Sequence, residues 1–107
     1  MTTLDPNSGY FVLINTFTVD PSKAEELLAV LSEATEHGMR QRPGFVSANL
    51  HISTDRRRVA NYAQWRSQAD FEAMMIDPEA KSHMMRAAEI ASSFDPIYYE
   101  LRECHGA

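Results

Sequence analysis

Apolar residues fall into runs with clear periods along the first part of the chain. The run from Tyr10 to Val19 is rich in β-branched and aromatic residues and contains no breaker, which predicts a strand. Asp20-Pro21 follows, a helix N-cap with proline at the first helical position. Apolar residues then recur at helical spacing until about Arg40, where Pro43-Gly44 stops the pattern. These signals predict a strand followed by a helix.

The middle of the chain predicts a β-hairpin. Apolar and polar residues alternate from Phe45 to Ile52, and a second strand pattern runs from Val59 to Trp65. The polar residues 54–57 between them predict a turn. The pattern does not determine the length of this turn, so either face of the first hairpin strand could adjoin Asn61 in the second.

The last part of the chain predicts a helix with a break and a fourth strand. Ser67 and Asp70 form a capping box that opens the helix. Asp77-Pro78 repeats the cap-and-proline signal, so the helix kinks or restarts there. Pro96 ends the helical pattern, and we expect the strand to run from Ile97 to Glu103.

The predicted order of elements is β-α-β-β-α-β. This is the order of the ferredoxin-like α+β fold, in which both helices cover one face of an antiparallel sheet. The length of 107 residues allows a single domain. We place this domain at residues 10–103, between a flexible leader at 1–9 and a short tail at 104–107.

The first predicted strand is apolar on both faces. Phe11, Leu13 and Phe17 point to one side, and Val12 and Ile14 point to the other. Two helices cover only one face of the sheet, so the other face is either a modestly apolar outer surface or an interface. We expect a homodimer that buries it.

Charge and composition argue against several classes of function. Ten basic and fifteen acidic residues give a net charge of −5, which is unlike a nucleic-acid binder, and the run Arg56-Arg57-Arg58 is typical of a solvated turn. No stretch approaches the ~20 apolar residues that cross a membrane, and no signal-peptide pattern is present, so we expect a cytoplasmic protein. Cys104 is the only cysteine, and no two histidines lie at metal-ligand spacing, so we expect no metal site.

Polar residues inside the strands are the first candidates for a site. Asn15 interrupts the most apolar strand, although asparagine is costly to bury without a partner. In the third strand, Asn61 and Trp65 share a face, with the small Ala63 between them. This arrangement suits a cavity that has a flat wall and an amide. The alternative is that Asn61 bonds a backbone group and Trp65 is ordinary core.

The helical segments add weaker candidates. His83 and Arg86 lie three residues apart and are neighbours on one helix surface. His83 is either a structural or exposed histidine, or a ligand or acid–base group. Met74 and Met75 belong to six methionines, which serve as adaptable packing and would also suit a broad, flat ligand.

Several stretches of the chain resemble one known family. They are Phe17-Thr-Val-Asp-Pro, Arg42-Pro-Gly-Phe-Val-Ser-Ala-Asn, Asn61-Tyr-Ala-Gln-Trp-Arg-Ser, Asp70-Phe-Glu-Ala-Met, Asp77-Pro-Glu-Ala and Phe94-Asp-Pro. Together they resemble the antibiotic biosynthesis monooxygenases, small proteins that form a dimeric α/β-barrel. The stretch that begins at Asn61 is similar to the cofactor-free members, which oxidise anthrone-type intermediates of aromatic polyketides to quinones.

The resemblance implies roles for individual residues. Asn61, Trp65 and Asn15 match residues implicated in catalysis, and Arg86 matches a helical arginine of one branch. A pocket tyrosine of that branch falls at Phe71, so a step that needs its hydroxyl is not available here. We also expect the substrate to contact four side chains: Phe17, Phe71, Met75 and His83.

The implied reaction needs a small aromatic substrate, O2 and no cofactor. An anthrone has an acidic C–H, and its enolate is electron-rich enough to reduce O2 directly. An asparagine amide can stabilise the enolate oxygen, and Trp65 can stack on the rings. The candidates for a general base are His51 and His83.

Two alternatives remain open from the sequence. Haem-degrading relatives use a first-strand asparagine, a helical tryptophan and a helical histidine; Asn15 and His83 match two of these, but Met74 or Met75 stands where the tryptophan would be. The third reading is a non-catalytic, dimeric ligand-binding accessory protein, because fold does not determine function.

Overall fold

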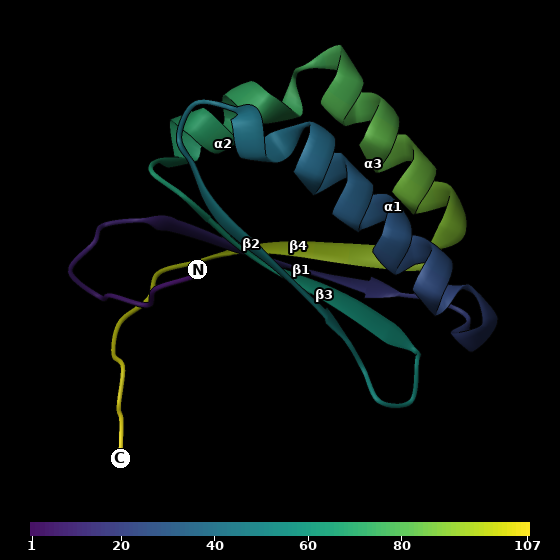
Figure 1. The fold of residues 1–107 in the computed structure, drawn as a ribbon, viewed down its shortest axis with the longest axis horizontal. Coiled ribbons are helices and arrows are strands. Elements are labelled where there is room, and N and C mark those ends of the chain that lie inside the picture. Colours follow the sequence, from purple (N-terminus) through teal and green to yellow (C-terminus); the bar gives the residue numbers. More distant parts are fainter.

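The computed structural model describes residues 1–107 and contains a four-stranded sheet and three α-helices (Figure 1). The elements run in the order β1 (Phe11–Thr18), α1 (Ala24–His37), β2 (Phe45–Ile52), β3 (Arg58–Trp65), α2 (Gln68–Met75), α3 (Pro78–Ile90) and β4 (Ser93–Tyr99). Short 3-10 turns, Pro21–Lys23 and Met39–Gln41, flank α1. This is the expected ferredoxin-like α+β fold, with the second helix divided into α2 and α3.

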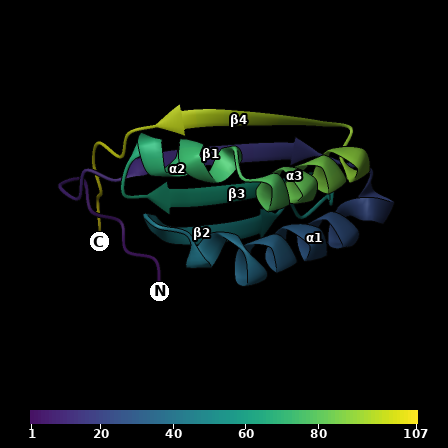
Figure 2. The same cartoon turned by 90° about the horizontal axis from the view of Figure 1, so that it is seen from above.

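The sheet has the strand order β2-β3-β1-β4, and all neighbouring strands are antiparallel. All three helices lie on one face of the sheet (Figure 1). Seen from above, α2 and α3 lie over the central strands and α1 lies along the β2 side, while β4 is not covered by a helix (Figure 2). None of the helices has the length and apolarity needed to cross a bilayer.

The helix starts follow the signals in the sequence. The Asp77 carboxylate accepts a hydrogen bond from the Ala80 N–H at 3.1 Å, with Pro78 in the first turn. This cap opens α3 as a separate helix, so the restart expected at Asp77-Pro78 is confirmed. Asp20 likewise accepts from the Ser22 side chain and N–H, and these two hydrogen bonds lower the pKa of Asp20.

The fourth strand begins earlier than expected. It runs from Ser93 to Tyr99 and not from Ile97 to Glu103, and Pro96 lies inside it, opposite Asn15. The prediction was wrong because proline was taken as a boundary. An edge strand leaves half of its N–H groups unpaired, so β4 accommodates a residue that has none.

The register of the hairpin brings the apolar face of β2 to the helix side. Leu50 pairs with Asn61, and Ala48 pairs with Ala63. A bulge between Phe45 and Ser47 shifts the start of the strand. The helix-covered face therefore carries the alternate residues of β3 that include Asn61, Ala63 and Trp65.

The helix-free face is partly covered by the leader. Gln64, 1% exposed, accepts a hydrogen bond from the Ser47 hydroxyl at 2.7 Å and donates one to the Thr3 carbonyl at 3.1 Å. The Thr2 hydroxyl donates to the Asn49 side chain. The leader has no helix or strand, yet its first residues lie against the sheet.

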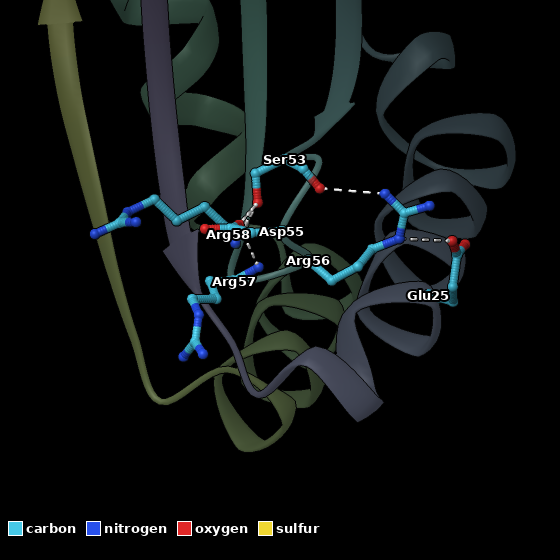
Figure 3. A network of polar contacts seen from close by, with 6 residues as sticks. All are labelled: Glu25, Ser53, Asp55, Arg56, Arg57 and Arg58. Atoms are coloured by element: carbon cyan, nitrogen blue, oxygen red, sulfur yellow. Dashed lines mark hydrogen bonds and ion pairs between the residues drawn. The ribbon is translucent and has the colours of Figure 1, made fainter.

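The turn between β2 and β3 is held by its own polar groups (Figure 3). Ser53 accepts from the Arg58 N–H at 2.9 Å, and Asp55 accepts from the Ser53 hydroxyl and the Arg57 N–H. The bonds to Arg57 and Ser53 lower the pKa of Asp55. Arg56 has a φ of 65° and lies 3.7 Å from Glu25. The arginine run is exposed, as expected, with Arg56 and Arg57 in the turn and Arg58 at the start of β3.

Gly44 is the glycine that this fold needs most. Its φ is +82°, and a Cβ at this position would collide with the Asp70 side chain. We expect Gly44→Ala to lower the free energy of unfolding by about 2–4 kcal/mol, from backbone strain and from the collision together. Urea denaturation measures this change.

Gly9 offers a matched control for this substitution. Its φ is +72°, but a Cβ there would meet nothing within 4 Å. Gly9→Ala should cost at most about 1–2 kcal/mol, which is the strain alone. Equal costs at the two positions would show that the contact with Asp70 does not matter.

Candidate active site

A cavity of about 80 Å³ lies between the helix-covered face of the sheet and the helices. Its lining has fourteen residues, of which eleven are hydrophobic. The sheet contributes alternate residues of β1 and β3, and the helix side contributes methionines from several elements. The methionines are Met39, Met74, Met75 and Met84.

Two asparagines supply the polar atoms of this cavity. Asn15 on β1 and Asn61 on β3 are directly opposite each other in the antiparallel ladder. The side-chain oxygens of both are buried and have no hydrogen-bond partner. An unpaired buried acceptor costs about 1–3 kcal/mol, so the fold tolerates two such atoms only at a cost to its stability. The alternative in which a backbone group satisfies the Asn61 oxygen is not what the structure shows.

Trp65 forms one wall and is rigidly packed. It is 1% exposed, and its ring meets Phe45 edge-on at a centroid distance of 5.5 Å and Phe71 at 6.0 Å. Phe71 in turn contacts Phe11 and Tyr98. This aromatic cluster sets the position of a flat surface beside Asn61. Trp65 is therefore both core and cavity wall.

None of the fourteen lining side chains is an acid or a base. His51 lies on the opposite face of the sheet, exposed, with its Nδ1 3.1 Å from the Asn49 carbonyl oxygen. Tyr62, whose pKa is raised by burial, also faces away from the cavity because it alternates with Asn61 along β3. The cavity thus offers amides and π-surfaces, and His51 is not placed to remove a proton within it.

The structure separates His83 and Arg86 from the two asparagines. Met84 lines the cavity, and Ala80 and Ala87 are buried on the same side of α3. Arg86, two residues beyond Met84, is rotated from it by about 200° and points away from the cavity. His83 lies one helical turn from Ala80 and Ala87 and shares their side of the helix. His83 lines a second hollow of about 230 Å³, and Arg86 is exposed on the outer surface of α3.

The other three residues expected to contact the substrate lie on the cavity wall. Phe17, Phe71 and Met75 all line the cavity. The sequence reasoning missed Phe94 and Pro96, which line it from β4. The signal was present in the Phe94-Asp-Pro stretch, but it was assigned to the end of a helix.

The family model described as antibiotic biosynthesis monooxygenase matches residues 10–86. The chain belongs to the antibiotic biosynthesis monooxygenase family. The tetracenomycin-F1 monooxygenase of Streptomyces glaucescens is 43% identical over 107 residues, which are 100% of this chain and 95% of the relative. At this similarity over the full length, the chain is a monooxygenase.

Solved structures show the same fold. A monooxygenase from the gene ActVA-Orf6 of Streptomyces coelicolor, in complex with the ligand nanaomycin D, matches with a TM-score of 0.85 and 28% identity, covering 96% of each chain. A protein from Shewanella oneidensis matches with a TM-score of 0.75 and 23% identity, covering 87% of this chain and 91% of that one. The second match supports the fold alone.

Proposed function

We propose that this monooxygenase works without a cofactor and uses O2 to oxidise an anthrone-like aromatic polyketide to a quinone. The observation that carries the proposal is a pair of asparagines, Asn15 and Asn61, whose buried side-chain oxygens have no partner, in a cavity walled by aromatic and thioether side chains. Two similar proteins support the substrate class, since one is named for tetracenomycin F1 and the other holds nanaomycin D.

The reaction balances without a further redox partner. Loss of a proton from the acidic CH2 of the central ring gives an enolate. The enolate passes one electron to O2, and the two radicals combine to form a peroxide at that carbon. The peroxide then loses water and leaves a carbonyl. One O2 thus converts CH2 to C=O and yields one H2O.

The asparagines stabilise the charge that develops on the substrate. A carboxamide offers an NH2 donor and an oxygen acceptor. The NH2 group of Asn61 can donate to the carbonyl oxygen that becomes the enolate oxygen, and a free amide oxygen can accept from a phenol hydroxyl beside it. Such donors are worth several kcal/mol in a site that excludes water. We assign enolate stabilisation to the asparagines. No side chain of the cavity is a base, so the proton passes to solvent water, which returns a proton when the peroxide forms.

Oxidation of dithranol tests the proposal. Flavin-free protein dialysed against a chelator should consume O2 and form the quinone faster than the protein-free background, which rises with pH because autoxidation needs the enolate. Wild type that never exceeds this background with dithranol or with plain anthrone would contradict the proposal and favour a ligand-binding accessory protein.

Hemin separates the proposal from the haem-degrading alternative. That alternative needs Asn15 and His83 at one haem together with a helical tryptophan, and Met74 or Met75 stands in place of the tryptophan. We expect titration with hemin to give no sharp Soret shift and no saturating one-to-one complex. A tight complex that His83→Ala abolishes would instead support the haem alternative.

We also propose that the protein is a homodimer. β4 is exposed along its whole length, and Ile97, 40% exposed, pairs with Ile14 on the helix-free face. An exposed apolar edge of this kind is typical of an interface. Sedimentation at micromolar concentration should give twice the 12.1 kDa chain mass.

A charge at the proposed interface provides the control. Ile97→Asp should shift the protein to monomer, whereas Met85→Asp, at an exposed position on α3, should leave the dimer intact. A wild-type protein that sediments as a monomer would disprove the dimer.

A further inference from the structure

Two hollows of the molecule share a wall. The cavity that contains Asn15 and Asn61 and the hollow that contains His83 are both lined by Met39 and Met74. Met39 lies in the 3-10 turn after α1, and Met74 lies in the last turn of α2. These two thioether side chains therefore separate an apolar inner space from a polar outer one.

The inner space is small for a fused-ring substrate. It measures about 80 Å³, whereas pockets for drug-sized molecules measure ~300–1,000 Å³. The outer hollow adds about 230 Å³, so the two together reach the lower end of that range. Methionine has three rotatable side-chain bonds and fills irregular gaps, so Met39 and Met74 can move aside without a backbone change.

Arg42, one of the residues that line the outer hollow, carries a hydrogen-bond donor that lacks an acceptor. The Nε–H of Arg42 is buried and has no hydrogen-bond partner, although Nη1 of the same side chain lies 3.4 Å from Asp77. Four further polar side chains line the hollow: His37, Gln41, Glu79 and His83. The lining contains one arginine and two carboxylates, so the hollow favours a neutral group that both accepts and donates hydrogen bonds over an anion.

We propose that Met39 and Met74 form a movable partition, and that the outer hollow binds a hydroxyl-bearing outer ring of the substrate. The reacting ring then lies against Asn15 and Asn61. The Arg42 Nε–H donates to the hydroxyl oxygen, and a carboxylate of the hollow accepts its proton in a hydrogen bond. This assignment rests on the proposed function and adds to it the feature of the substrate that is recognised.

Quenching of Trp65 fluorescence measures binding without turnover. Trp65 is the only tryptophan and lines the inner cavity, so a quinone that enters should quench it. The probes are anthraquinone, anthraflavic acid with one hydroxyl on each outer ring, and an anthraquinone with a carboxylate on one outer ring. Anthraflavic acid should bind about tenfold more tightly than anthraquinone, the effect of one charge-assisted hydrogen bond. The quinone with a carboxylate should bind no more tightly than anthraflavic acid.

Stiffening the partition tests the role of the methionines. Met39→Ile and Met74→Ile replace flexible side chains with β-branched ones of similar size. Each should weaken the binding of anthraflavic acid by about tenfold or more. Met74→Leu, whose side chain is not β-branched, should bind it nearly as tightly as wild type. Met85→Ile, at an exposed position on α3, is the matched control and should change nothing. Circular dichroism establishes whether each variant is folded. If Met74→Ile does not fold, Met39→Ile supplies the test.

Arg42→Lys tests the outer hollow. It keeps the positive charge beside Asp77 but removes the Nε–H. The preference for anthraflavic acid over anthraquinone should fall to about one.

The outcomes distinguish this proposal from the function it rests on. If wild type oxidises dithranol and binds all three quinones equally, or if the isoleucine variants and Arg42→Lys bind like wild type, the partition and the outer subsite are disproved and the proposed function stands. If wild type neither oxidises dithranol nor is quenched by any quinone, both proposals fall.

Discussion

Replacing Asn61 by alanine should lower kcat for dithranol oxidation by about ten- to a thousandfold, as single-donor deletions do elsewhere. The substitution removes an amide that has no partner within the fold for its oxygen, so little structural stability is lost. The remaining cavity still binds a flat substrate against Trp65. The loss should therefore fall on kcat, the step in which the enolate forms, more than on KM.

Asn49 provides a matched control for this substitution. It is an asparagine on the neighbouring strand β2, but its amide donates to the Tyr62 carbonyl at 2.9 Å on the opposite face. Asn49→Ala should leave kcat unchanged. Trp65→Phe keeps a flat ring and should cost less than Asn61→Ala if stacking is its main role. Folded Asn61→Ala protein that turns over like wild type would show that the site has been assigned to the wrong residues.

Replacing Asn15 by leucine should make the protein more stable and less active. The Asn15 side chain is buried, its oxygen is unpaired, and it borders the cavity. Leucine removes the unsatisfied acceptor and fills part of the space beside Phe17, so the free energy of unfolding should rise by about 1–3 kcal/mol. The same change removes one of the two amides from the site, so turnover should fall.

The opposite sign is expected at Asn49. Asn49→Leu removes a side chain whose amide is hydrogen-bonded, and it leaves the Tyr62 carbonyl without that donor. Urea denaturation of both variants compares a paired asparagine with an unpaired one. If Asn15→Leu lowers the free energy of unfolding as much as Asn49→Leu does, then Asn15 is a structural residue and the reasoning from its unpaired oxygen fails.

Local signals in the sequence predicted most of the fold. Asp20-Pro21, the Ser67 capping box and Asp77-Pro78 each mark a helix start, because the cap hydrogen bond is made within three residues. The strand face shared by Asn61 and Trp65 followed from the period of two. Signals of this kind do not depend on contacts between distant parts of the chain.

The start of β4 and the register of the hairpin could not be predicted, because they depend on contacts between distant parts of the chain. Pro96 would interrupt a strand that has neighbours on both sides, but an edge strand accommodates it, and the edge position of β4 emerges only once the sheet is assembled. The hairpin register required the bulge near Phe45. Arg86 was assigned to the site from the family resemblance, but the direction in which α3 packs turns Met84 toward the cavity and leaves Arg86 exposed.

Oxidation of dithranol under oxygen-18-labelled O2 tests the central claim most directly. With flavin-free, chelator-treated protein, the quinone formed above background should carry one labelled oxygen at the oxidised carbon. One quinone should form for each O2 consumed, the second labelled atom should appear in water, and Asn61→Ala should remove this excess. If the excess O2 consumption releases an equal amount of hydrogen peroxide, or if the new carbonyl takes its oxygen from water, the protein does not act as the cofactor-free monooxygenase described here.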